Sequence, residues 1–296
     1  MKIFNLKKRV SIKELQKILN LKFVSKKDQY ISSLSSYQRQ GNENLGFIDS
    51  DRLKNIKKSE VKSSCVIITK KIDAIKNFII YKNPRKLFEK ISIELIKNYS
   101  KNDEFLSPKE LLKYNVGSNV LISKHAKVDT KVKIESNVVI HKNTRIEKNT
   151  LISSGSVIGS VGLGPYFSGG IYKNCTHLGG VHIKKNCFIG SNSIIVRGTL
   201  GDTVIGDNSF ISNLVNIGHN VQIGKTCFIS SGVVIGGSTV INSLVKIGIG
   251  AVINRNIKIG TNVSIGLGSC VRKNIEKNKT VAGNPLRVID LKKKMF

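Results

Sequence analysis

The sequence predicts a mainly β chain, in which a parallel β-helix of six-residue repeats follows a small N-terminal α/β domain. Two observations predict this fold. From Val116 onward an aliphatic residue recurs at every sixth position through long runs, and a small residue follows many of these positions. The first hundred residues lack the repeat and contain short apolar runs and amphipathic segments instead. We therefore expect an α/β domain at 1–100, a linker at 101–115, the β-helix at 116–278 and a short C-terminal tail at 279–296.

The N-terminal region carries signals for helices and short strands. Residues 11–20 have helical spacing of aliphatic residues, and Ser11 and Glu14 form a capping-box pair at their start. In the linker, Ser107 followed by Pro108 is typical of the start of a helix. The other expected elements are short buried strands within 63–70 and 77–84 and an amphipathic helix at 85–99.

The six-residue period is explained by short strands that turn at corners. In a strand, residues i and i−2 face the same side, so the aliphatic residue of each hexad and the residue two before it point inward. The small residue that follows suits a tight corner, where Gly or Asn can adopt a positive φ. Three such strands close a triangular coil of 18 residues, and successive coils stack about 4.8 Å apart. The Gly-rich segment 159–170 interrupts the repeat and is expected to project as a loop, either beside a substrate or as a flexible excursion.

Composition excludes several classes of protein. A hydrophobic content of 40% excludes wholesale disorder. No segment approaches the roughly 18–20 apolar residues of a membrane-spanning helix. The N-terminus lacks the apolar core and cleavage site of a secretory signal, so we expect a cytoplasmic protein without stable membrane insertion. Five scattered cysteines without a CxxC pair argue against a disulfide framework or a zinc ribbon.

The net charge of +30 has two interpretations. It can attract an acidic partner, such as nucleic acid, an anionic membrane or an acidic carrier protein. It can also reflect biased composition, because the lysines are spread along the whole chain. Aromatic residues make up only 6% of the chain and Trp is absent, which argues against nucleic acid as a partner.

His219 is the candidate catalytic base. It follows a corner of the predicted ladder, so its imidazole should point outward, and one coil of 18 residues places Gly237 beside it. A neutral imidazole can act as a general base near neutral pH, and a glycine N–H can stabilise an oxyanion. This pair suits transfer of an acyl group from a thioester to an amine or hydroxyl. A histidine that merely hydrogen-bonds Asn213, Asn216 or Asn220 on a solvated edge would fit the same spacing.

Five strings follow one another in the repeat region: SVIGSVGLGPYF, HLGGVHI, RGTLGDTVIG, NLVNIGHNVQIG and IGGSTVI. In this order and spacing they resemble bacterial UDP-3-O-acylglucosamine N-acyltransferases of the lipid A pathway. Four N-terminal strings resemble the uridine-binding domain of that family: SIKELQKIL, GFIDSDRL, SCVIITK and IYKNPRKLFEKI. The resemblance covers nearly the whole chain and is most specific at 197–239.

The resemblance implies a left-handed β-helix that forms a homotrimer with active sites between subunits. It implies transfer of an acyl group from the thioester of an acidic acyl carrier protein to the amine of a UDP-linked amino sugar, without a cofactor. His219 would be the catalytic base, and the Gly237 N–H would bind the oxyanion. Asn213 and Asn216 would help to position the acceptor. Phe47 matches the first aromatic residue of the family's uracil clamp.

The sequence departs from the family at several positions. Ser212 stands where the family has the Asp that orients the imidazole, and Leu53 replaces the second aromatic residue of the uracil clamp. Asn216 stands where the family has Gln, and Asn256, a candidate substrate-binding residue, where it has a second histidine. The string KTVAGNPLRVI, residues 279–289, instead resembles the end of acetyl-CoA-dependent hexapeptide acetyltransferases. The alternative function is therefore an acetyl-CoA-dependent sugar O- or N-acetyltransferase of surface polysaccharide synthesis.

Two further alternatives have less support. The spacing of His141, His177 and His182 resembles that of the zinc histidines in γ-class carbonic anhydrases. The ladder shifts its register between Ile158 and Ile183, however, and the flanking strings follow the acyltransferase pattern, so we expect no metal. A non-catalytic β-helix is also possible, although the regular Thr ladders of an ice-binding face are absent from the sequence.

Overall fold

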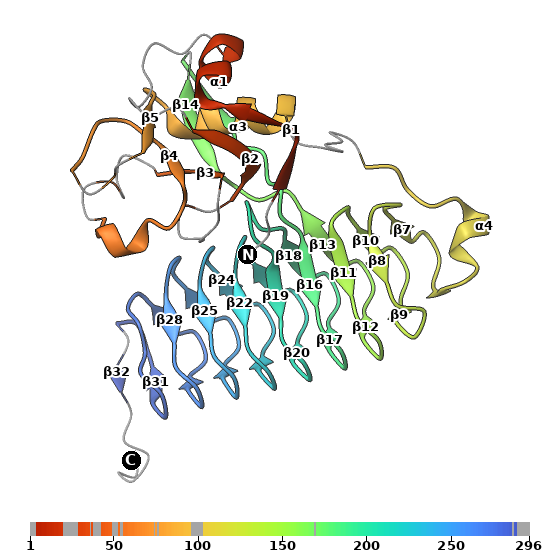
Figure 1. Ribbon diagram of the computed structural model, residues 1–296. Coiled ribbons are helices and arrows are strands. Elements are labelled where there is room, and N and C mark those ends of the chain that lie inside the picture. The colour runs from red at the N-terminus through yellow and green to blue at the C-terminus, as the bar shows by residue number, and fades with distance from the viewer. Residues whose placement is uncertain are drawn as a thin grey trace. The chain divides into compact units, whose positions relative to one another are not determined.

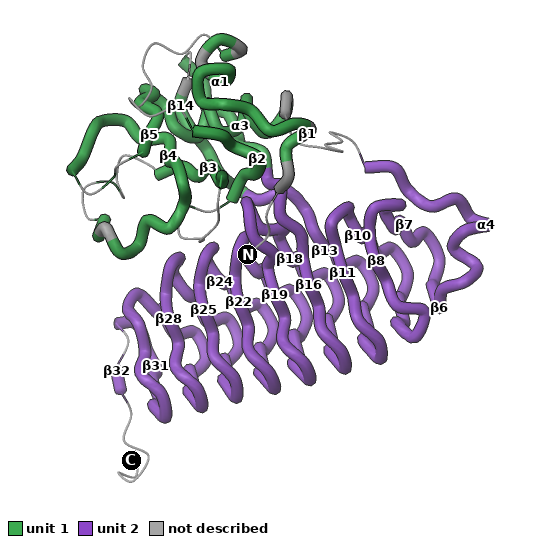
Figure 2. The backbone as a smooth tube through the Cα atoms, viewed as in Figure 1, with its two compact units in different colours: residues 1–101, 163–176 green, residues 102–162, 177–296 purple. Residues whose placement is uncertain are grey.

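The computed structural model describes residues 4–19, 29–35, 37, 43–48, 53, 56–73, 75, 77–95, 103–168, 170–285 and 287–288. The chain divides into two compact units (Figure 2). The first comprises 1–101 and 163–176, and the second comprises 102–162 and 177–296. The segment 163–176, which we expected within the β-helix domain, is thus part of the N-terminal unit.

The first unit is built on a five-stranded sheet in the order β1-β2-β3-β4-β5 (Figure 1). β1 pairs antiparallel with β2, and the remaining neighbours pair parallel. The strands are β1 (Phe4–Ser11), β2 (Tyr30–Leu34), β3 (Asn44–Phe47), β4 (Cys65–Ile68) and β5 (Phe78–Ile80). The helices are α1 (Ile12–Leu19), the 3-10 helix η1 (Lys58–Glu60) and α3 (Pro84–Leu95). The expected helices and the two expected strands are present, while the first three strands had no predicted counterpart.

The capping box at the start of α1 is present. The Ser11 hydroxyl accepts from the Glu14 N–H at 3.1 Å, and the Ser11 N–H donates to Glu14 Oε2 at 2.9 Å. These two bonds satisfy backbone donors that the helix itself leaves free. Its apolar face buries Ile12, Leu15 and Leu19, as the spacing predicted. Among the residues described here, no helix is long and apolar enough to cross a membrane.

The segment 163–176 forms an antiparallel hairpin of β14 (Pro165–Ser168) and β15 (Ile171–Asn174). We had expected a loop at 159–170. Tyr166 Oη donates to Glu89 Oε2 at 2.7 Å, and Thr176 Oγ1 donates to Glu89 Oε1 at 3.0 Å. Burial and the bond to Glu89 raise the pKa of Tyr166 to about 12. Because Glu89 lies on α3, these bonds tie the hairpin to the N-terminal unit.

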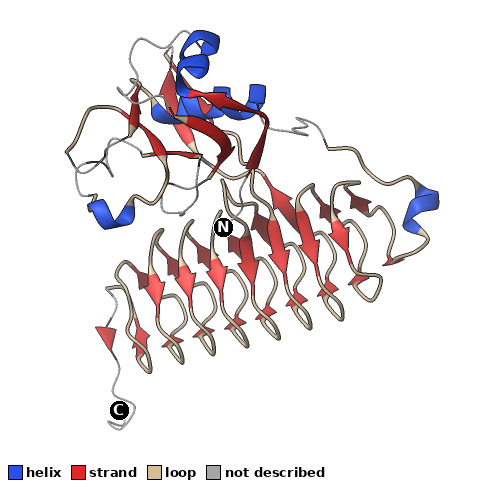
Figure 3. Cartoon of the chain, in the orientation of Figure 1, coloured by secondary structure: helices blue, strands red, loops and turns tan. Residues whose placement is uncertain are grey.

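The second unit is a solenoid of very short strands that stack in three parallel sheets (Figure 3). Sheet 1 contains β7 (Leu121–Ile122), β10 (Val139–Ile140), β13 (Val157–Ser160), β18 (Ile194–Val196), β21 (Asn216–Ile217), β24 (Val234–Ile235), β27 (Val252–Ile253) and β30 (Cys270–Val271). Sheet 2 contains β8 (Lys127–Val128), β11 (Thr144–Ile146), β16 (Val181–Ile183), β19 (Thr203–Ile205), β22 (Gln222–Ile223), β25 (Val240–Ile241) and β28 (Lys258–Ile259).

Sheet 3 forms the third side of the solenoid. It extends beyond residue 278, where we expected the β-helix to end. It contains β6 (Asn115–Val116), β9 (Lys133–Ile134), β12 (Leu151–Ile152), β17 (Phe188–Ile189), β20 (Phe210–Ile211), β23 (Phe228–Ile229), β26 (Lys246–Ile247), β29 (Ser264–Ile265), β31 (Thr280–Ala282) and β32 (Arg287–Val288). β31 pairs parallel with β29, so the solenoid continues beyond residue 278. Residues 289–296 of the predicted tail lie outside the described residues. Before the first coil, α4 (Pro108–Leu111) begins at the N-cap Ser107 with a capping box to Glu110.

The register of the strands follows the predicted coil of 18 residues. Ile217 pairs with Ile235 and Ile235 with Ile253, and each of these side chains is at most 1% exposed. The aliphatic residues of the hexads form one continuous core. Cys187 and Cys227 also point inward and are buried, and burial raises the pKa of the Cys187 thiol to about 11. Both thiols therefore behave as small apolar core groups.

The corners of the coils are occupied chiefly by asparagine in the left-handed backbone region. Asn tolerates a positive φ better than other residues that carry a Cβ. Some of these side chains bond along the corner from coil to coil, as Asn186 does by donating to Asn208 Oδ1 at 3.0 Å. The asparagines with positive φ are Asn119, Asn137, Asn143, Asn149, Asn186, Asn192, Asn208, Asn220, Asn256, Asn262 and Asn278. Each of these asparagines lies three residues after a hexad aliphatic, as Asn220 follows Ile217, and not directly after it, where we expected the positive φ. The residue directly after Ile217, Gly218, does not have a positive φ.

Candidate functional site

His219 lies at the corner between sheet 1 and sheet 2, two residues after Ile217 of β21. The pairing of Ile217 with Ile235 places Gly237 at the same corner of the next coil. A Cβ atom at Gly237 would lie 2.6 Å from His219 Nε2 and 2.8 Å from Cε1. The imidazole therefore lies directly over the Gly237 Cα, and only glycine leaves room for it. The structure brings together the two residues that coil spacing and resemblance had paired.

The backbone around Gly237 leaves one donor available. The Gly236 N–H donates to Ile253 O and the Ser238 N–H donates to His219 O, each at 2.8 Å. Within the described part of the chain, the Gly237 N–H between them donates to no backbone carbonyl. At the equivalent corner position of other coils the N–H has a partner, as the Lys142 N–H donates to Asp103 Oδ1 at 3.0 Å and the Arg255 N–H to Asn254 Oδ1 at 2.8 Å. At this coil a histidine side chain lies beside it instead. An N–H beside a candidate base is the arrangement that an oxyanion requires.

His177 is the neighbour that sequence reasoning missed. Its ring lies 5.6 Å from the His219 ring, centroid to centroid, with the planes at 73°. His177 is buried, whereas His219 is only partly buried. We had considered His177 only as a metal ligand. Coil arithmetic could not place it, because it follows the insertion in which the 18-residue register is lost.

Asn220 is the second neighbour of the imidazole. Its Oδ1 lies 3.1 Å from His219 Nδ1. Ser212, at the position where the family has an orienting Asp, does not take this role. Its hydroxyl instead contacts the Ser231 hydroxyl at 2.8 Å, at a different corner of the coil.

The other predicted residues of the solenoid lie in three different places: on the outer face of sheet 1, at the same corner two coils along, and at the corner before β21. Asn216 is exposed on the outer face of sheet 1, between Ile194 and Val234 of the adjacent coils. Asn256 is exposed two coils along, and its N–H donates to Gly237 O at 3.0 Å. Asn213 lies at the corner before β21, where its Oδ1 accepts from the Ser191 N–H at 2.8 Å. Asn216 is therefore better placed than Asn213 to contact a substrate held at His219.

Phe47 belongs to the N-terminal unit, at the end of β3. Its ring lies 5.0 Å from that of Phe88 on α3. Leu53, which replaces the second aromatic residue of the family's clamp, is only 4% exposed and belongs to a buried apolar cluster with Ile48 and Val66. Phe47 thus has an aromatic partner within its own unit, but Leu53 does not supply an open face for a base.

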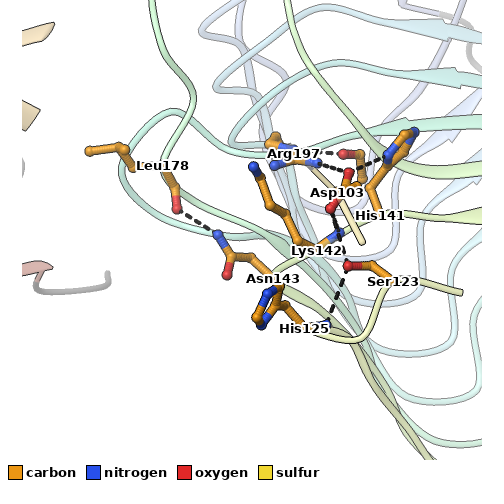
Figure 4. Close-up of polar contacts among 9 residues, drawn as sticks. Asp103, Ser123, His125, His141, Lys142, Asn143, Leu178 and Arg197 are labelled. Atoms are coloured by element: carbon orange, nitrogen blue, oxygen red, sulfur yellow. Dashed lines mark hydrogen bonds and ion pairs between the residues drawn. The ribbon is translucent and has the colours of Figure 1, made fainter. Parts of the chain in front are cut away.

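A second polar cluster surrounds Asp103 near the start of the solenoid (Figure 4). Its carboxylate accepts from Ser123 Oγ at 3.1 Å, from the Lys142 N–H at 3.0 Å and from His141 Nδ1 at 2.8 Å. Arg197 Nη2 lies 3.8 Å away, and Arg197, only 2% exposed, donates from Nε to Gly159 O at 2.6 Å. Burial would raise the pKa of Asp103, but these hydrogen bonds outweigh it and lower the pKa overall.

The three histidines of the zinc alternative have separate partners. His141 contacts Asp103, His182 Nε2 lies 2.8 Å from Glu147 Oε1, and His177 packs against His219. Among the described residues, no group of three or more His, Cys, Asp or Glu side chains is arranged to hold a metal ion. The carbonic-anhydrase-like interpretation therefore has no geometric support in this part of the chain.

Comparison with protein families places a known repeat at this corner. The family described as bacterial transferase hexapeptide (six repeats) matches residues 202–237. The matched stretch includes both His219 and Gly237. The chain therefore contains the hexapeptide transferase repeat in the region where the site lies.

Curated relatives match over a limited stretch. UDP-3-O-acylglucosamine N-acyltransferase of Saccharophagus degradans is 50% identical over 66 residues, which cover 22% of this chain and 19% of that protein. The enzymes of the same name from Rickettsia akari and Caulobacter vibrioides are 47% and 42% identical over 66 residues, covering 22% of this chain and 19% and 20% of those proteins. The match thus spans about a fifth of the length of these relatives. Over that stretch it confirms the resemblance seen in the motifs.

Solved structures with similar folds confirm the fold class. A UDP-N-acetylglucosamine acyltransferase matches with a TM-score of 0.52 and 24% identity, over 65% of this chain and 73% of that chain. LpxA from Acinetobacter baumannii matches with a TM-score of 0.50 and 20% identity, over 59% of this chain and 73% of that chain. At this level of identity the likeness concerns the fold alone. The solenoid is the predicted left-handed parallel β-helix.

Proposed function

We propose that this chain is an acyltransferase that acylates the amine of a UDP-linked amino sugar, with His219 as general base. The observation that carries the proposal is the imidazole of His219 over Gly237, within the stretch that matches the bacterial transferase hexapeptide family. His177 lies in a similar way against Gly162, with its Nε2 2.8 Å from the position of a Cβ, but that glycine lies outside the matched repeat.

The reaction can be written with these two groups and no cofactor. The acceptor amine attacks the thioester carbonyl carbon, and His219 removes a proton from the amine as the new C–N bond forms. The carbonyl oxygen becomes an oxyanion, which the Gly237 N–H stabilises. Collapse of this intermediate breaks the C–S bond, and the imidazolium returns its proton to the departing thiolate. Asn216, exposed beside His219 on the outer face of sheet 1, is the group best placed to contact the acceptor.

The acceptor follows from the names of the relatives and from the N-terminal unit. The matched relatives are named for acylation of a UDP-linked acylglucosamine. We propose that Phe47 contacts the uracil of such a substrate, since an aromatic face can stack on a base. The replacement of the second clamp residue by the buried Leu53 predicts that uracil is held from one side only.

The donor is proposed to be the thioester of an acyl carrier protein. The net charge of +30 favours association with an acidic protein. One observation favours the alternative donor, acetyl-CoA. A pocket of about 540 Å³ at the C-terminal end of the solenoid is lined by four cationic side chains and one Glu, which suits an organic phosphate. The four cations are Arg272, Lys273, Lys279 and Arg287.

Two outer faces of the solenoid support assembly into a homotrimer. Sheet 3 exposes stacked rings of Phe188, Phe210 and Phe228, with centroids 4.2 and 5.4 Å apart. Sheet 1 exposes aliphatic residues, among them Val234 and Val252, at 42% and 45%. A three-fold ring joins one face of each copy to a different face of the next, so two distinct apolar faces are what such a trimer needs. The outer residues of sheet 2 are mostly polar: Lys127, Arg145, His182, Val204, Gln222, Val240 and Lys258.

The proposal is tested by assaying acyl carrier protein thioesters and acetyl-CoA as donors, with UDP-linked amino sugars as acceptors. His219→Ala should lower the rate about 10²–10⁴-fold, which is the usual contribution of a general base. His125→Ala, which removes an exposed histidine from a corner of the first coil, is the matched control and should retain full activity. Full activity of His219→Ala would refute the catalytic role, and turnover with acetyl-CoA alone would establish the alternative donor.

A further inference from the structure

The imidazole of His219 is oriented by a neighbour whose own position is fixed from several sides. Asn220 occupies the corner with a φ of 60°, and its N–H donates to Thr203 Oγ1 at 2.9 Å. Its side-chain oxygen accepts from the Thr199 N–H at 2.9 Å, and its Nδ2 points to Gly201 O at 3.4 Å. Both partners lie in the loop 197–202 between β18 and β19. This loop therefore determines which way the Asn220 amide faces.

The amide orientation determines where the proton of the imidazole lies. A backbone N–H can only donate, so the Asn220 atom that faces Thr199 must be the oxygen. The same oxygen lies 3.1 Å from His219 Nδ1. An amide oxygen can only accept, so a hydrogen bond between these atoms requires a proton on Nδ1. In the neutral ring the lone pair then belongs to Nε2, the atom that lies over Gly237.

We infer that Asn220 is the positioning residue of His219, and that it fixes the Nδ1–H tautomer and leaves Nε2 as the proton acceptor. It takes the place of the carboxylate that the resemblance leads one to expect at position 212. The role of the base rests on the proposed function, whereas the tautomer does not.

The His177 ring packs at a steep angle against His219 and restricts the imidazole on that side. His177 is buried, and its ring stands at 73° to that of His219. The Gly237 backbone limits the imidazole from the next coil. Rotation of the ring by half a turn would keep its outline but place Cδ2 instead of Nδ1 opposite the Asn220 oxygen, and the contact would be lost. The Nδ1 bond therefore selects one of two ring orientations in a site where packing already restricts rotation.

The tautomer can be measured without any assay of activity. The full chain labelled with ¹⁵N-histidine gives ring nitrogen shifts that distinguish protonated from unprotonated nitrogen, and solid-state spectra of sedimented protein avoid the limit of size. His219→Gln assigns the signals among the five histidines. At neutral pH we expect Nδ1 of His219 to be protonated and Nε2 to be unprotonated. A proton on Nε2 in the unmodified chain would overturn the inference.

Three variants separate the amide's role from that of the corner. Asn220→Gly removes the amide while keeping a residue that accepts a positive φ, so the fold should persist. The Nε2–H tautomer should then become populated. Asn220→Asp keeps an acceptor oxygen at the same place and should retain the Nδ1–H tautomer. Asn208→Gly, at a corner with a φ of 58° on another edge of the coil, is the control and should leave His219 unchanged. An unchanged tautomer in Asn220→Gly would refute the positioning role.

Kinetics then connect the tautomer to catalysis. In Asn220→Gly we expect kcat to fall about tenfold to a hundredfold with KM nearly unchanged, because a ring with its proton on Nε2 cannot accept one there. In Asn220→Asp the acidic limb of the pH profile should move up by about one pH unit, because a carboxylate favours the protonated imidazole. If the unmodified chain has the Nδ1–H tautomer but transfers no acyl group, the proposed function alone is refuted. If the unmodified chain transfers acyl groups and neither Asn220 variant changes kcat or the pH profile, the positioning role alone is refuted.

Discussion

At Gly237 a glycine is needed because of a neighbouring side chain and not because of its own backbone conformation. Its φ is not among the positive values found at the corners, so a side chain is excluded only by the imidazole above it. Gly250, by contrast, has a φ of 65° and open space around it. A side chain at Gly237 is therefore disfavoured by the neighbouring imidazole, whereas a side chain at Gly250 is disfavoured by its own backbone conformation.

We predict that Gly237→Ala lowers kcat/KM about a hundredfold while the fold is retained. The added Cβ would lie 2.6 Å from His219 Nε2, a distance that forces the imidazole to move. Displacement of a general base by about 1 Å can cost two orders of magnitude. The measurement is steady-state kinetics, with thermal unfolding as the check on folding. Gly250→Asn, which suits a positive φ, should match the unmodified chain in both, and normal activity of Gly237→Ala would contradict the geometry of the site.

Asp103 provides a prediction about pH and stability. Hydrogen bonds from His141, Lys142 and Ser123 lower its pKa, so the folded state binds its proton less tightly than the unfolded state does. The charge of Asp103 therefore contributes its full stabilisation at pH values above the ordinary Asp pKa near 4. This stabilisation is lost as the pH falls through the lower pKa that Asp103 has in the folded state. Asp103→Asn should cost about 1–3 kcal/mol at pH 7, since the donors lose a charged acceptor.

The measurement is urea unfolding of Asp103→Asn and of the unmodified chain from pH 7 downward. The difference in free energy of unfolding should shrink below pH 4. Asp129→Asn, at an exposed position of the same solenoid, should show a much smaller difference at pH 7. A constant difference across this range would mean that the Asp103 charge does not contribute.

At the scale of elements, the corners of the coils limit the choice of residue more strictly than the strands do. Most corners with a positive φ carry Asn or Gly, but Leu214 and Leu244 adopt φ of 59° and 63°. A leucine in this region is strained, because its Cβ crowds the following carbonyl oxygen. Leu244 is also 51% exposed, so its side chain gains little from burial.

We predict that Leu244→Asn stabilises the chain by about 1 kcal/mol, because Asn adopts this conformation at lower cost. The new amide would also stand between Thr226 and Asn262 in the column of corner residues. Thermal or urea unfolding measures the change. Leu244→Ala keeps a Cβ at the strained position and is the control, so equal stability of the two variants would show that backbone strain is not the cause.

The repeat region was predictable because each short strand has only two inward positions. The sequence places an aliphatic residue at one of them and a small or aliphatic residue at the other. The same logic placed Gly237 beside His219. It could not place His177, since the hairpin between β13 and β16 removes the fixed spacing on which coil arithmetic depends. β1 was also missed, because Lys7, Lys8 and Arg9 interrupt its apolar alternation, and its register shifts between Asn5 and Val10. Asn220 was noticed only as one polar neighbour, because the loop that orients its amide is distant in the sequence.

At the scale of the whole molecule, the three outer faces of the solenoid differ in chemistry. Phe188, Phe210 and Phe228 form a stacked aromatic row on sheet 3, while sheet 1 exposes aliphatic residues. Monomeric soluble proteins rarely expose large contiguous apolar patches, so these two faces are expected to be covered. The polar face of sheet 2 is expected to remain in solvent.

We predict that the chain has three times its monomer mass of 32.6 kDa in solution. Phe210→Asp should shift it toward the monomer, because the variant places a charge in the middle of the aromatic row. Sedimentation equilibrium or light scattering measures the mass. Lys127→Asp, on the outer face of sheet 2, should remain trimeric. A monomeric unmodified chain, or an unchanged mass for Phe210→Asp, would argue against the proposed assembly.

The hairpin of β14 and β15 has a consequence for the order in which the chain is made. The N-terminal unit cannot contain all of its parts until residue 176 has left the ribosome, 75 residues after the unit's first segment ends at residue 101. At translation rates of about 5–20 residues per second, Tyr166 and Thr176 are synthesised roughly 4–17 s after Glu89, the residue that they bond. During that interval the first coils of the solenoid emerge and can stack. Biosynthesis thus begins the C-terminal unit before it completes the N-terminal one.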